Sequence, residues 1–391
     1  MNLNRMSFIF FLLSFSFMFF AIKDKSVILL HPSDRIQLKV VSDSVVTLNI
    51  SVVGDLLCHA PQYNSARIAK TDSFNFNPVF SQIKPYLDKS DFTFGNLETV
   101  ISNKNKNLSG YPNFNSPYEF LSALKYAGFD ILFTANNHAL DKGRSGVVRT
   151  ISQIKSVKMN SVGTYLSRSD RDSIRIFKKN GISFALLAYT YGTNGYRISK
   201  KNNFLISTID KQKIKADLLK ADKYFPDLVI VYFHFGNEYQ RFPSKFQKEI
   251  VKFAIKNGAD IILGSHPHVL QPVEKFKSLS GRIDSGLVAY SLGNFISNQR
   301  WRYADAGGIL NISIGKDKDK DSVYFSSLSF LPTWVYKGIV NGKVQYQILP
   351  SGSEKNVFEY FSKEDSSNMS SSFSDAQKQI KLEMQNLKLL R

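Results

Sequence analysis

The sequence predicts an α/β layered domain, and two features of the residue pattern support this expectation. First, short apolar runs typical of buried strands alternate with stretches of helical length between residues 46 and about 300, as in layered α/β folds. Second, polar motifs containing His, Asp and Asn directly follow several of the strand runs. With 391 residues, 43% of them hydrophobic, the chain is long enough to bury a large core.

The first predicted strand, 46–57 (VTLNISVVGDLL), first alternates between apolar and polar residues and then becomes wholly apolar, which is typical of a buried strand. Further strands are expected at 92–94, 131–134, 184–189, 228–233, 261–263 and 287–291. Helices are expected between them at 79–88, 118–127, 146–157, 209–223 and 244–257. Ser116-Pro117 begins the second of these helices and Gly128 ends it, while Ser244 is suited to cap the last.

After Trp301 the pattern changes to strands without helices between them. The segments GGILNISI, VYFSSLSFLPTWVY and VQYQIL, within residues 307 to 349, are expected to complete or flank the sheet. The main domain is therefore expected to span residues 46–350.

Residues 351–391 are expected to form a polar linker and a C-terminal helix. The linker is the Ser-rich stretch 351–372, and Ser374 with Gln377 is suited to a capping box. The helix carries an apolar stripe at helical spacing, made of Phe373, Ile380, Met384, Leu387 and Leu390. Such a stripe favours packing against the parent domain over binding to a membrane or a partner helix.

The N-terminus has the features of a secretory signal or a membrane anchor. Arg5 precedes an apolar run at 7–22, and three charged residues follow that run at once. Residues 19–22 (FFAI) offer no good cleavage site, so we favour an uncleaved membrane anchor at 1–25 and a stalk at 26–45. The rest of the chain would then lie outside the cytoplasm, in the cell envelope, or be secreted if the segment is cleaved.

The net charge of +19 suggests an anionic partner such as an acidic polymer, a phosphate compound or a lipid surface. The alternative is a general richness in Lys, because the basic residues are scattered along the chain. This scatter and the lack of a nucleic-acid-binding motif argue against nucleic acid. The single cysteine, Cys58, has no partner for an internal disulfide and is expected to be a buried structural thiol.

Five of the six histidines lie in compact polar motifs at predicted strand ends. These motifs are GDLLCH (54–59), ANNHALDKG (135–143), FHFGNEY (233–239) and GSHPH (264–268), with FGNLET (94–99) among them. Loops that leave the carboxyl ends of strands in an α/β sheet converge on one edge, so the motifs are expected to meet in one pocket. Their carboxylates, imidazoles and amides suit one or two divalent ions of the Mn, Fe or Zn type.

His266 and His268 are separated only by Pro267. In an extended segment both rings would project to the same side, and the proline would stiffen their spacing. A lone histidine is more often a core or surface residue, but this pair follows a strand and accompanies the other motifs. The co-occurrence therefore favours a metal site.

In order, these motifs resemble those of the CapA-type proteins of poly-γ-glutamate capsule synthesis, within the calcineurin-like metallophosphatase superfamily. The resemblance extends from about residue 48 to 297 and covers GDLLCH, GNLETVIS, ANNHALDKG, HFGNEYQRFPS, GADIILGSHPHVLQPVE and YSLGNFIS. It implies an extracytoplasmic, membrane-attached protein with a four-layer α-β-β-α sandwich, in which helices flank two central sheets.

The resemblance also implies roles for individual residues. Asp55 would bind a first metal, and Glu98, which stands where metallophosphatases have a bridging aspartate, would span two metals. His138 would protonate a leaving group, and Asp141 would either hold His138 or cap the next helix. The other implied metal ligands are His268 for the first ion and Asn137, His234 and His266 for the second.

Four further residues are candidates for the metal or the pocket, namely His59, Asn96, Glu238 and Asn294. His59 lies four positions after Asp55, whereas phosphoesterases place a histidine two positions after the aspartate. Glu238 is expected to support the ligands or line the pocket, and Asn294 to shape its rim. The longer side chain of Glu98, compared with aspartate, favours a single metal or a different substrate geometry.

Several of these residues also have structural explanations. Asp55 could cap the following turn, Glu98 could pair with a Lys or Arg, and His234 could be a satisfied core histidine. Asn136 and Asn137 could occupy left-handed turn positions and bond their own backbone, which is the preferred interpretation of Asn136.

Three functions remain open from the sequence. The first, which we favour, is a metal-dependent hydrolase-like site acting on a phosphoester or a γ-glutamyl amide during synthesis or export of an acidic surface polymer. The second is a non-catalytic subunit that grips such a polymer and works with membrane-embedded synthase or export partners. The third is an interaction protein whose tail, 373–391, recruits a partner.

Overall fold

The computed structural model describes residues 44–352, 358–381 and 388–389. The expected anchor at 1–25 and the stalk up to residue 43 lie outside these residues, so both remain predictions. Within the described part of the chain, no helix has the length and apolar character needed to cross a membrane.

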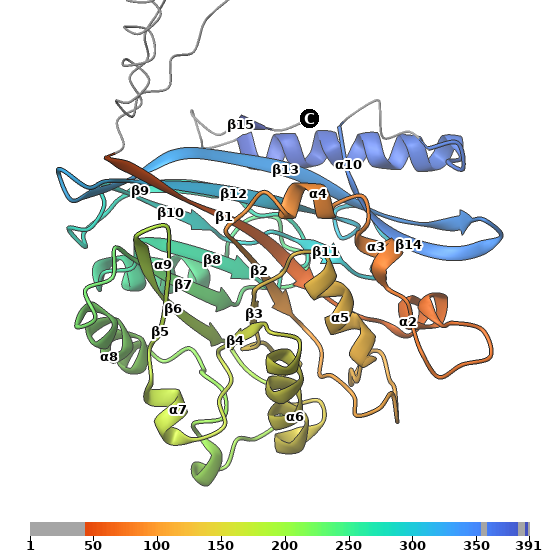
Figure 1. Cartoon of the computed structure of the whole chain (residues 1–391), viewed down its shortest axis with the longest axis horizontal. Helices are drawn as coiled ribbons and strands as arrows, with labels where there is room; N and C mark the ends of the chain where they lie inside the picture. Colours follow the sequence, from red (N-terminus) through yellow and green to blue (C-terminus); the bar gives the residue numbers. More distant parts are fainter. Residues whose placement is uncertain (1–43, 353–357, 382–387, 390–391) are drawn as a thin grey trace, which may run out of the picture.

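Two sheets form the centre of the fold (Figure 1). In the larger, the strand order is β14 (Lys343–Pro350), β13 (Ser322–Val340), β12 (Ala306–Asp317), β1 (Val45–Leu56), β2 (Phe92–Leu97), β3 (Ile131–Phe133) and β4 (Asn160–Val162). Two short strands join it, β11 (Asn294–Ile296) beside β1 and β15 (Lys388–Leu389) beside β13. In the smaller, the order is β5 (Arg175–Lys179), β6 (Ile182–Thr190), β7 (Leu228–His234), β8 (Ile261–Ser265), β10 (Ser285–Ala289) and β9 (Val273–Lys277).

The sheets pack face to face through one hydrophobic core, in which Ile50 and Phe94 of the larger sheet share a cluster with Leu186 and Ile230 of the smaller. The outer face of the larger sheet is covered by α2 (Ala60–Ala66), α3 (Asn77–Phe80), α4 (Lys84–Leu87) and α5 (Tyr118–Tyr126). The outer face of the smaller sheet is covered by α8 (Lys211–Asp222) and α9 (Lys245–Lys256). The mixed α/β fold expected from the sequence is confirmed, with helices outside both sheets.

The remaining helices are α6 (Gly143–Ser156), α7 (Arg168–Asp172), the 3₁₀ turn η1 (Lys200–Asn202) and α10 (Lys363–Lys381).

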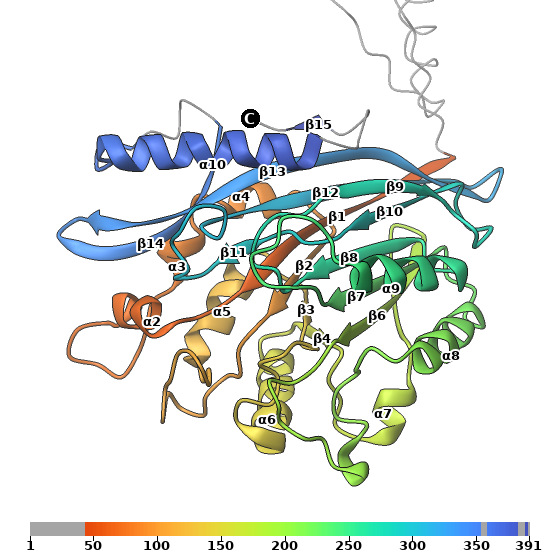
Figure 2. The same ribbon diagram turned by 180° about the vertical axis from the view of Figure 1, so that it is seen from behind.

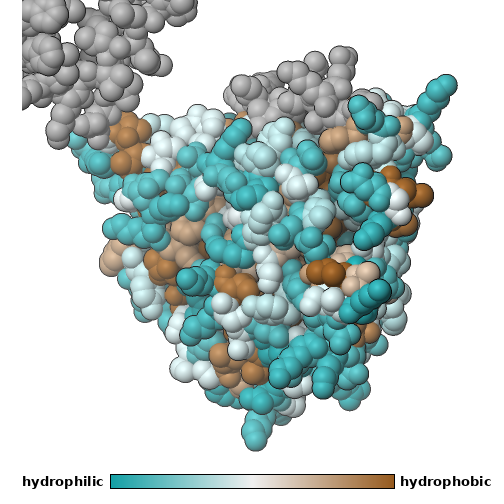
Figure 3. Space-filling view, turned by 45° about the vertical axis from the view of Figure 1, so that its right-hand side comes forward, coloured by the Kyte–Doolittle hydropathy of each residue, from teal (hydrophilic) through white to brown (hydrophobic). Residues whose placement is uncertain are grey.

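Because the apolar side chains fill the layers between sheets and helices, few of them gather on the surface. On the face shown in Figure 3, hydrophobic residues form small separate groups among hydrophilic ones.

Each strand expected between 46 and 300 has a counterpart, but the helix expected at 79–88 is divided into α3 and α4. Pro85 lies in the first turn of α4, where its missing N–H is tolerated, although it cannot continue a helix that begins in α3. Ser244 caps α9 as expected, because its Oγ accepts from the N–H of Gln247 at 3.2 Å. The Gln247 side chain accepts the N–H of Ser244 in return, at 2.9 Å.

The C-terminal helix begins earlier than the sequence suggested. Residues 363–372, expected to belong to a polar linker, form the first half of α10, so Ser374 and Gln377 lie inside the helix and do not cap it. Tertiary packing explains the difference, since buried Met369 contacts the cluster around Trp334 and so stabilises a Ser-rich turn of low helix propensity.

Farther along α10, Ala376 and Ile380 join the core between the sheets. The helix runs beside β13 at one side of the molecule (Figure 2). The expected stripe residues Met384, Leu387 and Leu390 lie outside the described residues.

Asp227, which precedes β7, links the two sheets. Its carboxylate accepts the N–H and the hydroxyl of Ser183 in β6, at 2.7 and 2.8 Å, and the ammonium of Lys316 in β12, at 2.7 Å. Burial alone would raise the pKa of Asp227, but the hydrogen bonds from Lys316 and Ser183 outweigh it and hold the pKa below its ordinary value.

We expect Asp227→Asn to lower the free energy of unfolding by about 1–2 kcal/mol at pH 7, because it weakens charge-assisted hydrogen bonds between the sheets. The pKa of Asp227 is lower in the folded protein than in the unfolded chain, where it is about 3.9, so the ionised carboxylate stabilises the folded protein at pH values above about 3.9. This stabilisation is lost as the pH falls through the folded-state pKa. Urea denaturation should therefore show the two proteins converging in acid, while the exposed Asp72→Asn serves as a control with little effect. An equal difference in the free energy of unfolding between the two proteins at every pH would contradict the role given to the Asp227 carboxylate.

Candidate metal-binding site

The polar motifs meet where the carboxyl ends of parallel strands from both sheets come together. Asp55 lies near the end of β1, Glu98 directly follows β2, and His234 ends β7. His266 and His268 follow β8, while Asn137 and His138 follow β3. All of these side chains are buried. The topology therefore brings seven residues chosen from the sequence to one edge of the two sheets.

Asp55 and Glu98 are held on either side of one amide. The Nδ2 of Asn96 donates to Oδ1 of Asp55 at 2.7 Å and to Oε2 of Glu98 at 3.1 Å. The hydroxyl of Ser265 also donates to Asp55. Asn96, a candidate for the metal or the pocket, therefore positions both carboxylates.

The other oxygens of the two carboxylates face imidazoles. Oδ2 of Asp55 lies 3.0 Å from Nδ1 of His268. Oε1 of Glu98 lies 3.5 Å from Nε2 of His234 and 3.9 Å from Nε2 of His268, and it has no hydrogen-bond partner among the described residues. No Lys or Arg of the described segments forms an ion pair with either acid, so the alternative of Glu98 paired with a Lys or Arg is wrong.

The two acids have opposite pKa shifts. Burial raises the pKa of Glu98 well above its ordinary value, and the negative charge of Asp55 adds to the effect. Burial would also raise the pKa of Asp55, but the hydrogen bond and charge of His268, together with His234 and Ser265, hold it below the ordinary value. Without a cation, the pair therefore favours a single negative charge.

The three imidazoles surround the free oxygen of Glu98. The ring of His266 is centred 4.8 Å from that of His234 and 6.0 Å from that of His268, and its Nδ1 has no partner among the described residues. Burial and the neighbouring His268 lower the pKa of His266 to about 3. Burial and His266 also lower the pKa of His234 well below its ordinary value. Both rings are therefore neutral near pH 7, which is the form that binds a metal.

The backbone at His266 and His268 differs from the extended segment that we expected. Both residues have positive φ, +101° and +60°, in a bend that follows β8. Non-glycine residues rarely adopt this region, and its strain is typical of functional sites. The two rings reach the acids through this bend and not through the alternation of a strand.

Gly54 allows another close approach at the site. A Cβ at this position would lie 1.9 Å from the carbonyl oxygen of Gly293, and the N–H of Asp55 donates to that same oxygen at 2.9 Å. The glycine therefore lets β1 approach the loop before β11 closely enough to fix the backbone of Asp55.

His138 lies beside the cluster and is held in place by Asp141. Nδ1 of His138 is 2.8 Å from Oδ2 of Asp141, which also accepts the N–H of Phe114 at 2.7 Å. The ring of Phe114 packs edge-on against His138 with centroids 4.7 Å apart. Of the two roles considered for Asp141, the structure supports holding His138, because the residue capping α6 is Lys142.

Three sets of side chains bring one potential ligand atom each to within 4.8 Å of one another. They are Glu98 with His234 and His266, Asp55 with Glu98 and His268, and exposed Glu238 with His266 and His268. The combination of carboxylates and neutral imidazoles suits a divalent metal. The residues present thus fit such an ion, and Glu98 is common to the first two sets.

The remaining candidates lie around this cluster. Oδ1 of Asn137 is 2.8 Å from Nε2 of His234, so His234 lies in the site and is not an isolated core histidine. His59 belongs to none of the three sets, and its Nδ1 lies 3.1 Å from Oε1 of Gln62. Asn294 is buried and donates to Gln299 at 2.9 Å and to the carbonyl of Ala304 at 2.8 Å, and its role at the rim stays a prediction.

Asn136 braces the loop by a route that the sequence did not indicate. Its amide donates to the carbonyl of Leu97 at 2.7 Å and to the Asn96 side chain at 3.1 Å, while its Oδ1 accepts the N–H of His138 at 3.2 Å. It bonds the nearby backbone as expected, but its φ is not among the positive values, so the left-handed assignment is wrong.

Three site residues were not singled out from the sequence. The ring of Tyr191 lies tilted against that of His266 with centroids 4.5 Å apart, and Asn194 accepts from Asn137 at 3.1 Å. Both lie in the loop after β6, which has no histidine or acid to mark it. Ser265 lies inside the GSHPH motif, and its place between strand and bend was the one available signal.

Comparison with known proteins gives the family. The family model described as "Bacterial capsule synthesis protein PGA_cap" matches residues 49–299. The "PGA biosynthesis protein CapA" of Bacillus subtilis (strain 168) is 31% identical over 269 residues, which are 68% of this chain and 67% of that protein. The "Capsule biosynthesis protein CapA" of Bacillus anthracis is 32% identical over 263 residues, 65% of this chain and 61% of that protein. The matched part thus spans about three fifths to two thirds of these relatives.

Similar solved structures have much lower identity. The calcineurin-like phosphoesterase YfkN of Bacillus subtilis has a TM-score of 0.43 at 14% identity, covering 85% of this chain and 97% of that one. The NAD nucleotidase NadN of Haemophilus influenzae has a TM-score of 0.46 at 10% identity, covering 88% and 57%. Scores this low say nothing about activity. The family match covers most of the chain and every motif of the site, from Asp55 to Asn294, so the chain belongs to the bacterial capsule synthesis protein family PGA_cap.

Proposed function

We propose that this chain acts in the synthesis or export of an acidic surface polymer of the poly-γ-glutamate type, through a metal-dependent, hydrolase-like site. Family membership and the net charge of +19 support the polymer, since a basic protein attracts a polyanion. One observation supports the proposed metal: Asp55 and Glu98 are buried together with no Lys or Arg partner in the described residues.

A divalent cation would resolve the electrostatics of this pair. Two buried carboxylates without a counter-ion are costly, and buried polar atoms such as Oε1 of Glu98 and Nδ1 of His266 normally have a partner. Asp55, Glu98 and His268 would hold one ion, and Glu98, His234 and His266 a second, with Asn137 beside it. The donor types suit Mn, Fe or Zn, and such ions polarise a scissile bond and activate water at neutral pH.

His138 is proposed to donate a proton to the leaving group. Asp141 and Phe114 fix its ring, which leaves Nε2 as the nitrogen directed away from Asp141. A positioned acid of this kind typically contributes about 100- to 10,000-fold to a rate. The bond cleaved would be a phosphoester or a γ-glutamyl amide of an anionic envelope compound.

Location and partners extend the proposal. Residues 7–22 would anchor the chain in the membrane, the domain would lie outside the cytoplasm, and a membrane-embedded synthase or export complex would be its partner. The helices outside both sheets support a four-layer sandwich of the metallophosphatase type. Fractionation of cells should find the chain with membranes, and removal of residues 1–25 should release it.

Metal binding is testable apart from catalysis. In thermal denaturation, Mn²⁺ or Zn²⁺ at 100 times its Kd should add about 2.7 kcal/mol to the free energy of unfolding, and a chelator should remove this gain. His266→Ala should lose at least one equivalent of metal by elemental analysis and most of the stabilisation. His31→Ala, outside the site motifs, is the matched control. Equal metal content in wild type and His266→Ala would reject the site.

Turnover separates an enzyme from a binding subunit. Metal-loaded protein should cleave a phosphodiester or a γ-glutamyl peptide, and His138→Gln should lower kcat by about 100-fold or more with little change in metal content. Asp141→Asn should lower kcat by a smaller factor, because the imidazole remains but loses its partner. Polymer binding that survives the loss of all metal ligands, without any turnover, would instead support the non-catalytic subunit.

A further inference from the structure

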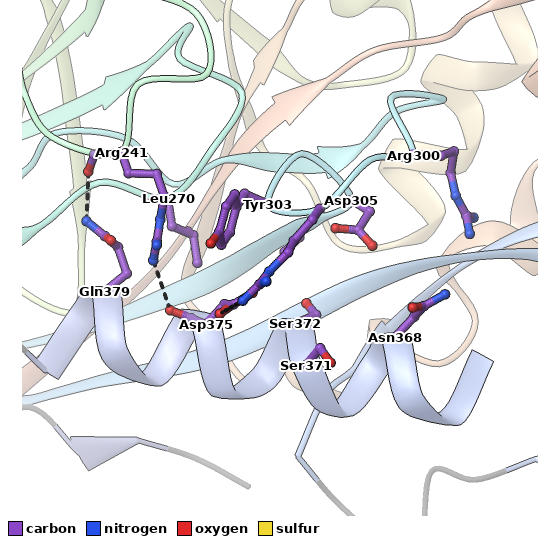
Figure 4. A pocket seen from close by; sticks show the side chains of 13 residues that line it. Arg241, Leu270, Arg300, Tyr303, Asp305, Asn368, Ser371, Ser372, Asp375 and Gln379 are labelled. Carbon is purple, nitrogen blue, oxygen red and sulfur yellow. Dashed lines mark hydrogen bonds and ion pairs between the residues drawn. The ribbon is translucent and has the colours of Figure 1, made fainter. Parts of the chain in front are cut away.

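A cavity of about 230 Å³ lies between α10 and the loop 298–305, apart from the metal cluster (Figure 4). Arg241, Arg300 and Arg302 line it, and α10 forms the opposite wall with Ser372, Asp375 and Gln379. Typical small-molecule pockets have volumes of roughly 300–1,000 Å³, so this cavity suits one small group of a larger ligand.

The arginines outnumber the available acids. Arg302 forms two hydrogen bonds with the Asp375 carboxylate, at 2.9 and 3.0 Å. Neither Arg241 nor Arg300 has a carboxylate oxygen within 4.0 Å in the described segments. The other acid of the cavity, Asp305, accepts the indole N–H of Trp334 at 2.8 Å. Two guanidinium groups therefore form no direct ion pair in the described residues, although Asp305 acts on Arg300 at longer range.

Both guanidinium groups are nevertheless held in position. Arg241 lies over the ring of Tyr303, 4.2 Å from its centroid, and its one hydrogen bond from the guanidinium within the described residues goes to the backbone oxygen of Asp375, at 3.5 Å. Arg300 donates to the carbonyl of Val335 at 2.9 Å and lies 5.6 Å from the centroid of Trp334. Because these contacts use few of the donors of each guanidinium, the rest are available to a ligand.

The wall formed by α10 adds an unsatisfied hydroxyl. Oγ of Ser372 is buried and has no hydrogen-bond partner among the described residues, and Figure 4 shows its side chain directed from α10 toward the cavity. Gln379 donates to the carbonyl of Arg241 at 2.7 Å, which ties the loop to the helix. Buried polar atoms are normally paired, so this hydroxyl indicates a polar occupant.

The cavity shares its loops with the metal cluster. Tyr239, two residues before Arg241, has its ring 6.1 Å from that of His268 and 5.3 Å from that of Trp301. Trp301 in turn precedes Arg302, which lines the cavity. The exposed rings of Tyr239 and Trp301 therefore connect the surroundings of His268 with the loop that carries Arg302.

We propose that this cavity is a second, carboxylate-binding subsite that holds one acidic group of a polymer segment extending from the metal cluster. The inference rests on the proposed function, because it assigns the subsite to the same acidic polymer. Arginine suits the role, since its planar guanidinium bonds a carboxylate through two parallel N–H donors. Asp375 already occupies Arg302 in this way, so it competes with the ligand and limits the affinity.

Binding of labelled poly-γ-glutamate to the full chain tests the subsite. All variants are made on a His138→Gln background, which keeps every proposed metal ligand but lacks the proposed proton donor, so the result does not depend on cleavage. Arg241→Gln with Arg300→Gln should weaken binding about 10-fold or more, equivalent to about 1.4 kcal/mol. Lys248→Gln with Lys252→Gln, on exposed positions of α9, removes the same charge and should change binding less than about 2-fold, as distant surface charges are screened by salt.

Asp375→Asn should change the affinity for poly-γ-glutamate in the opposite direction. It removes the competing carboxylate and should tighten binding several-fold, an effect that partial unfolding would not produce. Equal losses in the two double variants, or no loss in either, would overturn the subsite. A loss seen only with polyphosphate in place of poly-γ-glutamate would overturn its assignment to a carboxylate. Turnover measured with His138 intact reports on the proposed function independently.

Discussion

The burial of two carboxylates side by side, Asp55 and Glu98, is the constraint on which the rest of the site depends. They come from neighbouring parallel strands of the larger sheet, and the smaller sheet closes over them with its histidines. One amide, from Asn96, separates them. A folded protein tolerates such a pair when a proton or a cation compensates the charge, and the neutral imidazoles of His234 and His266 favour a cation.

The two-sheet architecture explains how residues so distant in sequence meet. The carboxyl ends of β1, β2 and β3 in one sheet open on the same edge as those of β7 and β8 in the other. Helices cover the outer faces, so the polar edge is the place where loops from both sheets converge. The loops 236–243 and 298–305 contribute Arg241, Arg300 and Arg302 to the cavity that faces α10.

Much of the fold and of the site could be predicted because both follow from local rules. Apolar runs of residues predicted the strands. The preference of metal ions for carboxylate, imidazole and amide ligands restricted the candidate site residues to the polar residues at strand ends. The split at Pro85, the helical start of α10 and the bend at His266 and His268 were missed. The split follows from Pro85 itself, which cannot continue a helix, whereas tertiary packing extends α10 over a Ser-rich segment and the bend places His266 and His268 in a backbone region that local patterns rarely indicate. Asn194 and Tyr191 were missed because their loop carries no ligand of its own.

The sequence by itself determined the chemical inventory: which acids, imidazoles and amides the chain places after its strands, and the surplus of positive charge. The tertiary structure alone decided how these groups interact. Only the packing of the two sheets makes Glu98 common to two sets of ligands. The same packing leaves Asp55 and Glu98 without an ion pair to any Lys or Arg of the described residues. The reason is physical, because desolvation and distances between side chains arise when remote strands pack, and no local pattern contains them.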